Sequence, residues 1–270
     1  MAATPSASNP QQSSLLEPIR ALGEYCLNTV HQMGCMFIFL LAAIKQMVLP
    51  PFRPRTLMAQ IHFIGIRSLF VIILTGAFVG MVLALQGYYT LSRFGSEAML
   101  GPAVAASIIR ELGPVLSGIM VTGRAGSALT TKLGMMRVTE QIDALETMGI
   151  NSMKLLVTPA IEATLISLPL LNVIFCVVGI YGGYLVAVQL LGLSQGTYFG
   201  GIETAIVAKD ITVSLIKSVC FGLIIAWICT FKGYFTQRGA EGLGSAMTSA
   251  VVLCSVLILV SDYFITALML

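Results

Sequence analysis

The chain alternates between long apolar stretches and short polar segments. Residues 68–92, 163–202 and 242–261 contain no Asp, Glu, Lys or Arg. A helix needs about 20 apolar residues to cross the hydrocarbon core of a bilayer, so each stretch is long enough to do so. The pattern predicts five membrane spans, at residues 61–90, 99–131, 156–190, 210–234 and 243–268.

The N-terminal part differs from this pattern. Residues 1–14 are rich in Ser, Pro and Gln and show no hydrophobic period, which predicts a disordered tail. Within residues 15–49, an apolar stretch at 25–44 is interrupted by three polar residues. We expect a helix lying at the membrane interface there, with a true span as the alternative. Residues 50–270 then form the membrane domain.

Composition agrees with an all-α polytopic membrane protein. Hydrophobic residues make up 57% of the chain and charged residues 10%, whereas soluble domains carry about 25% charged residues. A net charge of +3 without a basic cluster argues against nucleic-acid binding. Six cysteines lie singly in apolar stretches and two histidines lie far apart, so we predict no disulfide framework, metal site or catalytic set.

Basic residues predict the orientation of the spans. With the N-terminus in the cytoplasm, the segments outside hold only Arg93 and Lys209. The cytoplasmic segments and span ends then hold eleven basic residues: Arg20, Lys45, Arg53, Arg55, Arg67, Arg124, Lys132, Arg137, Lys154, Lys232 and Arg238. Since cytoplasmic loops carry the excess of Lys and Arg, we expect the N-terminus inside and the C-terminus outside.

Two adjacent ionisable residues, Arg110 and Glu111, lie near the middle of the second predicted span. Such residues usually face a cavity or a partner, because an unpaired charge in the membrane is costly. Pro114 has no N–H, so it leaves the carbonyl of residue 110 without its helical donor. We interpret this depth as a groove for a polar head group or an ion. The alternative is a structural ion pair with Lys217, Glu162 or Asp210.

The polar segment after the second span predicts a short amphipathic helix over 136–149, ended by Gly149. Its apolar stripe holds Val138, Ile142, Leu145 and Met148, and its acidic face holds Glu140, Asp143 and Glu146. Acidic residues on a cytoplasmic loop indicate docking to a basic protein surface. An interfacial helix between spans is the alternative.

Glycine-containing segments indicate packing rather than nucleotide binding. Residues 123–127 (Gly-Arg-Ala-Gly-Ser) resemble a phosphate loop only superficially, because the chain contains no Gly-Lys-Ser/Thr. Gly76 and Gly80 form a pattern that permits close helix approach. We therefore expect no cofactor and no enzymatic activity in this chain, and any ATP hydrolysis must belong to a separate subunit.

Several of these motifs together resemble the signature of MlaE-type ABC transporter permeases. They are 110–114 (Arg-Glu-Leu-Gly-Pro), 123–127 and 136–146 (Met-Arg-Val-Thr-Glu-Gln-Ile-Asp-Ala-Leu-Glu). The resemblance continues at 80–88, 167–171, 216–218 and 266–269, and covers about residues 50–270.

This resemblance implies a phospholipid permease of the bacterial inner membrane, with an N-terminal interfacial helix and five spans. It implies a homodimer that works with a cytoplasmic ATPase dimer, a periplasmic MCE-domain ring and often a STAS-domain subunit. Such assemblies move phospholipids between the inner and outer membranes and maintain outer-membrane lipid asymmetry. On this basis the substrate cavity is assigned to Arg110, Glu111, Pro114 and Tyr88. The ATPase-coupling helix within 132–150 is assigned to Arg137, Glu140, Asp143 and Glu146.

Two other classes of function remain open at this point. An ATP-independent secondary transporter or channel would use Arg110, Glu111 and Lys217 as an ion or proton relay. An assembly scaffold would need these charges only for packing between helices.

Overall fold

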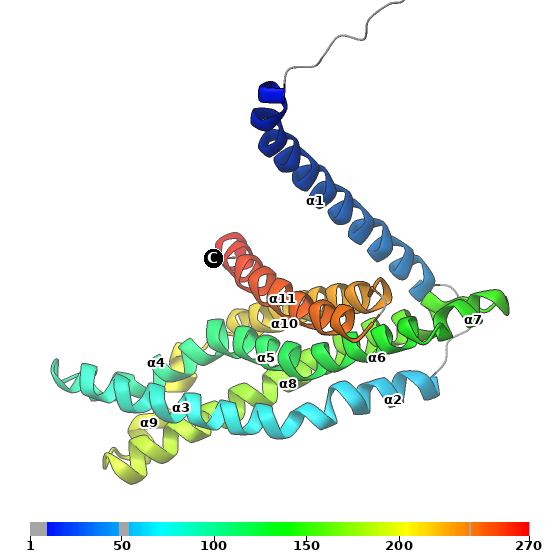
Figure 1. Ribbon diagram of the computed structural model, residues 1–270. Coiled ribbons are helices and arrows are strands. Elements are labelled where there is room, and N and C mark those ends of the chain that lie inside the picture. Colours follow the sequence, from blue (N-terminus) through cyan, green and yellow to red (C-terminus); the bar gives the residue numbers. More distant parts are fainter. Residues whose placement is uncertain (1–9, 49–53, 238, 270) are drawn as a thin grey trace, which may run out of the picture.

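The computed structural model describes residues 10–48, 54–237 and 239–269, and all regular elements within these residues are helical (Figure 1). The α-helices are α1 (Pro10–Val48), α2 (Pro54–Ile64), α3 (Leu69–Ser92), α4 (Leu100–Ser107), α5 (Gly113–Val121), α6 (Ser127–Val138), α7 (Gln141–Thr147), α8 (Thr158–Tyr184), α9 (Gln195–Ala205), α10 (Ala208–Tyr234) and α11 (Ala240–Met269). Short 3-10 turns, η1 (Ile66–Ser68) and η2 (Glu97–Met99), and π-helical turns, η3 (Ile108–Leu112), η4 (Thr122–Gly126), η5 (Met153–Val157) and η6 (Leu185–Leu190), connect or extend them.

The five predicted spans are confirmed as long helical stretches of sufficient length and apolarity to cross a membrane. Their bounds are Pro54–Ser92, Glu97–Val138, Met153–Leu190, Ala208–Tyr234 and Ala240–Met269. Each is longer than predicted, because the helices continue past the apolar residues into polar flanks. In the part of the chain that the structure describes, a sixth stretch, Val30–Met47 in α1, also meets these criteria.

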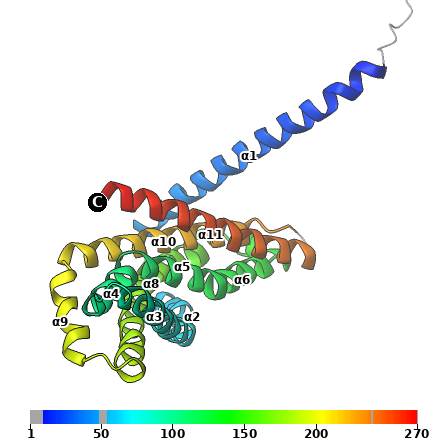
Figure 2. The ribbon, with the colours of Figure 1, turned by 90° about the vertical axis from the view of Figure 1, so that its left-hand side faces the viewer.

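Helix α1 lies apart from the others and is steeply inclined to the bundle (Figures 1 and 2). Its C-terminal part is anchored to α10: Trp227 Nε1 donates to the Met36 carbonyl oxygen at 2.8 Å, and the Phe39 and Phe231 rings lie 5.5 Å apart. The inclination fits the predicted interfacial position, while the composition of residues 30–47 permits the alternative, a span. The position of α1 in the membrane therefore stays a prediction.

Helix α1 begins at Pro10, so it includes residues 10–14 of the predicted tail, and the boundary of that tail stays a prediction. Propagation of a helix costs far less than its nucleation, so polar Gln and Ser residues can extend a helix that forms downstream. The rest of the tail, residues 1–9, and the predicted break at 50–51 lie outside the described residues.

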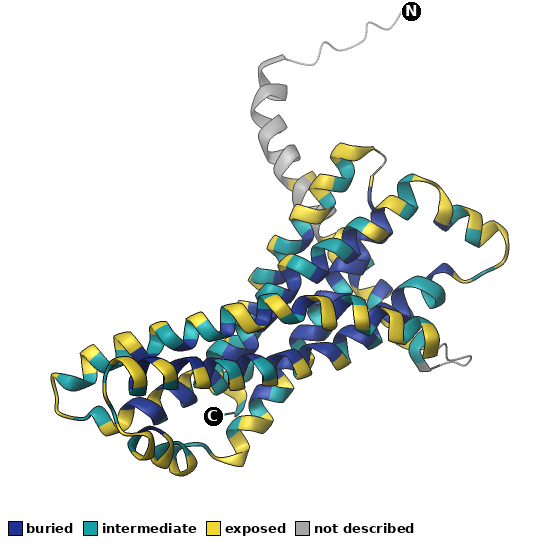
Figure 3. Cartoon of the chain, turned by 90° about the horizontal axis from the view of Figure 1, so that it is seen from below, coloured by how far each residue is buried: buried dark blue, intermediate teal, exposed yellow. Residues whose placement is uncertain are grey.

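Glycines bring α3 and α8 into backbone contact at the centre of the bundle. A Cβ on Gly80 would lie 1.8 Å from the Gly179 carbonyl oxygen, and one on Gly76 would lie 3.1 Å from that of Phe175. The predicted close approach at Gly76 and Gly80 is confirmed. Buried residues follow the inside of the bundle, and exposed ones face outward (Figure 3). Many of these are large apolar residues such as Phe78 and Leu170, as expected of surfaces that face lipid.

The two ends of the bundle carry different loops. Helix α7 and the C-terminal end of α1 lie at one end (Figure 1), and α9 lies across the other (Figures 1 and 2). We call these the α7 end and the α9 end. Arg93 follows the last residue of α3 and Lys209 lies in the first turn of α10, which places both at the α9 end.

Candidate functional site

Arg110 and Glu111 lie in the π-helical turn η3, which interrupts the second span between α4 and α5. The Gly113 N–H donates to the Ile108 carbonyl oxygen, five residues earlier, whereas an α-helix would bond four residues back. Gly113 is required here, because a Cβ would lie 2.6 Å from Cys176 Sγ on α8. Such π-turns frequently mark functional sites. The local sequence therefore both widens the helix and packs it closely against α8.

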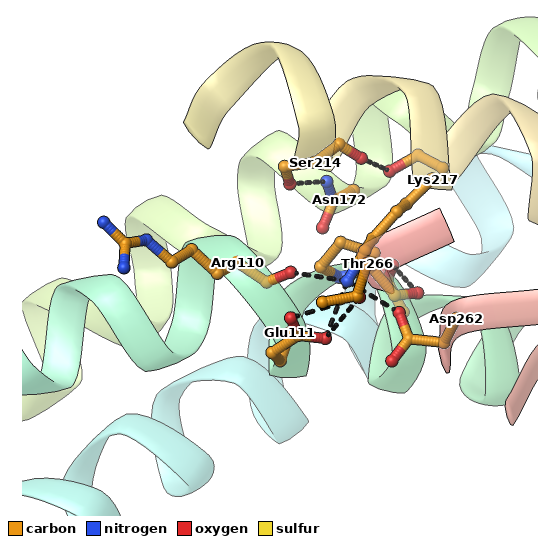
Figure 4. Close-up of polar contacts among 10 residues, drawn as sticks. Arg110, Glu111, Asn172, Ser214, Lys217, Asp262 and Thr266 are labelled. Carbon is orange, nitrogen blue, oxygen red and sulfur yellow. Dashed lines mark hydrogen bonds and ion pairs between the residues drawn. The ribbon is translucent and has the colours of Figure 1, made fainter. Parts of the chain in front are cut away.

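Lys217 of α10 is fully buried and reaches this turn (Figure 4). Its Nζ lies 2.6 Å from Glu111 Oε2, 2.8 Å from Asp262 Oδ1 of α11, and 2.9 Å from the Arg110 carbonyl oxygen. The contacts with Glu111 and the Arg110 carbonyl oxygen are hydrogen bonds, and the contact with Asp262 is an ion pair. The carbonyl that Pro114 leaves without its helical donor is therefore bound by a lysine from another helix.

The three ionisable side chains of this cluster differ in their access to solvent. The Lys217 side chain is 0% exposed, that of Asp262 is 18% exposed and that of Glu111 is 44% exposed. Thr266 Oγ1 also donates to Glu111 Oε1 at 3.3 Å. One buried cation thus contacts two carboxylates, and the Glu111 carboxylate is the more exposed of the two. We name Glu111, Lys217 and Asp262 the charge cluster.

A second ion pair lies beside the charge cluster. Arg110 Nη2 is 2.9 Å from Asp210 Oδ2, which also accepts the Val207 N–H at the start of α10. A carboxylate at a helix N-terminus is stabilised by the helix dipole, so Asp210 ties Arg110 to the first turn of α10. Figure 4 shows the Arg110 side chain directed away from Glu111, as expected of neighbours on a helix.

A cavity of about 140 Å³ borders the Arg110–Asp210 ion pair and Glu111. It is lined by Arg110, Glu111, Lys209, Asp210, Val213, Thr266 and Met269. Pockets that enclose whole drug-sized ligands measure about 300–1,000 Å³, so this cavity suits a small polar group and not a whole lipid. A guanidinium and a carboxylate border it, which allows it to hold a group with charge of either sign.

The structure brings together two of the four residues assigned to the substrate cavity. Arg110 and Glu111 line it, whereas Pro114 is buried in α5 and shapes the site through its missing N–H. Tyr88 lies on α3, with its ring 6.2 Å from that of Tyr89, and is not a lining residue. Tyr88 was assigned from the sequence motif alone, which does not indicate where its side chain points.

The alternative of structural ion pairs was correct for two of its three partners, Lys217 and Asp210. Glu162 on α8 takes no part in either ion pair. Sequence reasoning assigned neither Thr266 nor Asp262 to the site. The signal for Asp262 was its position just after an uncharged stretch, which by itself also fits the end of a span.

The predicted coupling helix is divided into two. Helix α6 continues to Val138, and α7 begins only at Gln141, after Glu140 with φ at +58°. The predicted single helix from Met136 was therefore wrong, because a left-handed residue breaks the helix. The predicted stop at Gly149 is confirmed: its φ is +74°, and the Ile150 N–H donates to the Leu145 carbonyl oxygen in a Schellman motif.

The acidic side chains of this segment are bound within the chain. Asp143 pairs with Arg137, and Glu146 Oε1 accepts from Tyr234 Oη at 2.7 Å and from Ser152 Oγ at 2.8 Å. Hydrogen bonds from Tyr234 and Ser152 lower the pKa of Glu146 below its ordinary value of 4.5. These contacts fix α7 to the end of α10. The segment thus shows no free acidic face made of all three residues.

Comparisons with known proteins identify the family of this chain. A family model described as "Permease MlaE" matches residues 57–268. The chain belongs to the MlaE permease family. It is 42% identical over 254 residues to a "Probable ABC transporter permease protein" of Rickettsia bellii, covering 94% of this chain and 98% of the relative.

Two other relatives are named for lipid transport or chloroplast location. The "Intermembrane phospholipid transport system permease protein MlaE" of Haemophilus influenzae is 41% identical over 214 residues, which cover 79% of this chain and 82% of the relative. "Protein TRIGALACTOSYLDIACYLGLYCEROL 1, chloroplastic" of Arabidopsis thaliana is 35% identical over 213 residues, covering 79% and 61%. This MlaE-family chain is accordingly a multi-pass ABC permease.

Proposed function

We propose that this chain is the membrane permease of an ABC transporter that moves phospholipids between the inner and outer membranes of a bacterium. The observation that carries the proposal is the match of residues 57–268 to the MlaE family, with a phospholipid transport permease among the relatives. Its role would be to maintain the lipid asymmetry of the outer membrane. ATP would be bound and hydrolysed by a separate subunit, because no phosphate-loop motif occurs in the sequence.

The proposed assembly is a homodimer of this chain with a cytoplasmic ATPase dimer, a periplasmic MCE-domain ring and a STAS-domain subunit. The cavity of about 140 Å³ supports the homodimer, because it holds only a head-group-sized moiety in one protomer. A second copy would supply further walls for the acyl chains. Affinity purification of the tagged chain in mild detergent tests the assembly, and recovery of lipid transport without any ATPase would favour the ion-driven alternative.

Arg110 and Glu111 are proposed to contact the lipid head group. Arg110 would pair with the phosphate, and Glu111 would face a cationic amine or its counterpart in the second protomer. Glu111→Gln should lower both the co-purified phospholipid and the lipid-stimulated ATPase activity of the complex. Glu203→Gln is the matched control, since Glu203 is an exposed carboxylate on α9 outside the cavity. Unchanged lipid content in Glu111→Gln would refute the assignment.

Helix α7 is proposed to contact the ATPase through its outward face. Asp143 and Glu146 are bound internally, so the exposed Gln141, Ala144 and Met148 are better placed for docking than the acidic residues. Met148 is 71% exposed. Met148→Glu should reduce recovery of the ATPase, whereas Leu190→Glu, at a 76% exposed residue of the α9 end, should not. Equal recovery with both variants would remove α7 from the interface.

The proposed orientation places the α7 end in the cytoplasm and the C-terminus in the periplasm. Single cysteines in a chain without its native cysteines test this proposal. Gly196→Cys on α9 should react with an impermeant reagent in intact spheroplasts, and Thr147→Cys on α7 should react only after lysis. Gly23→Cys reports on α1. If it reacts with the reagent only after lysis, as Thr147→Cys should, α1 is an interfacial helix; if it reacts in intact spheroplasts, as Gly196→Cys should, α1 is a span.

A further inference from the structure

Three basic side chains surround one aromatic ring between α2 and α6. The Arg67 and Arg124 guanidinium carbons lie 5.9 and 5.3 Å from the centroid of the Phe63 ring, and Lys132 Nζ lies 6.0 Å from it. Each distance is within the range of a cation–π contact. The three residues come from η1, η4 and α6, so folding brings together charges that are far apart in the sequence. We name them the basic triad.

Within the described residues, no carboxylate forms an ion pair with the basic triad. Arg124 is the most buried of the three and donates to the Phe63 carbonyl oxygen and, at 3.3 Å, to Ser68 Oγ. The side chains of Arg67 and Lys132 are exposed. Three like charges around one ring repel each other, and a bound anion would relieve this repulsion.

The basic triad lies at the depth of lipid head groups. Arg67 directly precedes the uncharged residues 68–92, and Arg93 directly follows them. At 1.5 Å per residue these 25 residues extend about 37 Å, slightly more than the ~30 Å hydrocarbon core. Arg67 and Arg93 therefore mark opposite boundaries of the core. Since α2 and α6 point toward the α7 end, the triad faces the leaflet on that side (Figure 1).

We propose that Arg67, Arg124 and Lys132 bind the phosphate of an anionic phospholipid in the leaflet at the α7 end. Arg124, which the backbone holds in place, provides the fixed part of the site. Arg67 and Lys132 approach the phosphate from the exposed side. A zwitterionic lipid brings its own amine, which the triad repels, so lipids with net negative charge such as phosphatidylglycerol are preferred.

This site is separate from the cavity proposed for the transported lipid. Arg124 follows Glu111 by 13 residues along the same span, a distance of about 20 Å at 1.5 Å per residue. The lipid at the triad is thus a bound component of the permease and not its cargo. The proposal does not depend on phospholipid transport, because it rests on the charges and their depth alone.

Binding of phosphatidylglycerol to delipidated full-length permease in detergent tests the proposal, with phosphatidylethanolamine as the zwitterionic comparison. The double variant Arg67→Gln/Lys132→Gln retains the Arg124 contacts with the backbone. Each basic residue near an anionic lipid surface contributes enough affinity that losing two should weaken binding roughly 30-fold. Arg55→Gln/Arg93→Gln removes two exposed arginines outside the triad and should leave binding unchanged.

Three results would overturn the proposal. The first is equal phosphatidylglycerol affinity in the two double variants, and the second is equal affinity of the wild type for both lipids. The third is that inorganic phosphate alone stabilises the wild type against heat as much as phosphatidylglycerol does, which would indicate a site for free phosphate. Lys132→Gln alone serves as a second, milder variant. Glu111→Gln should retain the phosphatidylglycerol bound at the triad, which separates failure of this site from failure of the cargo cavity.

Discussion

Replacing Lys217 by Met removes the one cation of the charge cluster and nearly conserves the volume of the side chain. Glu111 and Asp262 then face each other without a counter-ion, and the Arg110 carbonyl oxygen loses its donor. Removing one partner of a buried ion pair costs about 3–5 kcal/mol. Asp262 is only 18% exposed, so water cannot fully replace its contact with Lys217, whereas Glu111 is 44% exposed and can be hydrated. We therefore expect a loss of stability near the lower end of this range, about 3 kcal/mol.

Two companion variants make the reasoning specific. Glu111→Gln leaves Lys217 paired with Asp262 at 2.8 Å and keeps a carbonyl acceptor, so it should cost only about 1 kcal/mol. The triple variant Lys217→Met/Glu111→Gln/Asp262→Asn contains no charge in the cluster. Since neutral replacements of buried ion pairs are often tolerated, it should recover most of the stability that Lys217→Met loses.

Unfolding by SDS in mixed micelles measures these differences, with helical content followed by circular dichroism. The chain has one tryptophan, Trp227, whose contact with Met36 gives an independent fluorescence signal from the α1–α10 junction. A Lys217→Met permease within 1 kcal/mol of wild type would contradict the argument that the buried lysine compensates the Asp262 and Glu111 carboxylates. So would a triple variant that is less stable than Lys217→Met.

Two further predictions concern the α7 end and the centre of the bundle. Because the pKa of Glu146 is lowered in the folded state, its bonds to Tyr234 and Ser152 stabilise the fold fully above pH 4.5. This stabilisation is lost as the pH falls through the lower pKa of the folded state. The difference in stability between wild type and Glu146→Gln should therefore be constant at neutral pH and shrink in that acid range. Gly80→Ala should destabilise by about 1–3 kcal/mol, because its Cβ would lie 1.8 Å from the Gly179 carbonyl oxygen. Gly118→Ala, with its nearest atom at 3.5 Å, should be nearly neutral in the same unfolding assay.

The spans could be predicted from the sequence because the membrane imposes a length and a polarity that a single chain reveals locally. The uncharged stretches at 68–92 and 242–261 each lie almost entirely in one helix, α3 and α11, whereas 163–202 extends through α8 and η6 into α9. The ends were less predictable. Polar residues at 10–14 extend α1, since a helix propagates through residues that would not start one.

The candidate site could be predicted only in part. The positions of Arg110, Glu111 and Pro114 in one turn gave the depth of the site and the carbonyl free to accept. Which helix supplies the donor depends on packing between distant segments, so Lys217 could only be named among three partners. The acidic residues at 140–146 show where periodicity misleads. Their spacing predicted one face of one helix, but Glu140 has a positive φ and breaks that helix.

The charge cluster also has a consequence for the order in which the chain enters the membrane. Ribosomes deliver Glu111 first, then Lys217, and Asp262 last, since the three lie in that order in the sequence. A lysine at the centre of a helix costs about 2.5–3.5 kcal/mol during insertion. Helix α10 therefore benefits from a carboxylate already in the bilayer, and insertion of α10 should be less efficient in a Glu111→Gln chain, as glycosylation mapping can measure. Asp262 then joins α11 to a site that the earlier helices have formed.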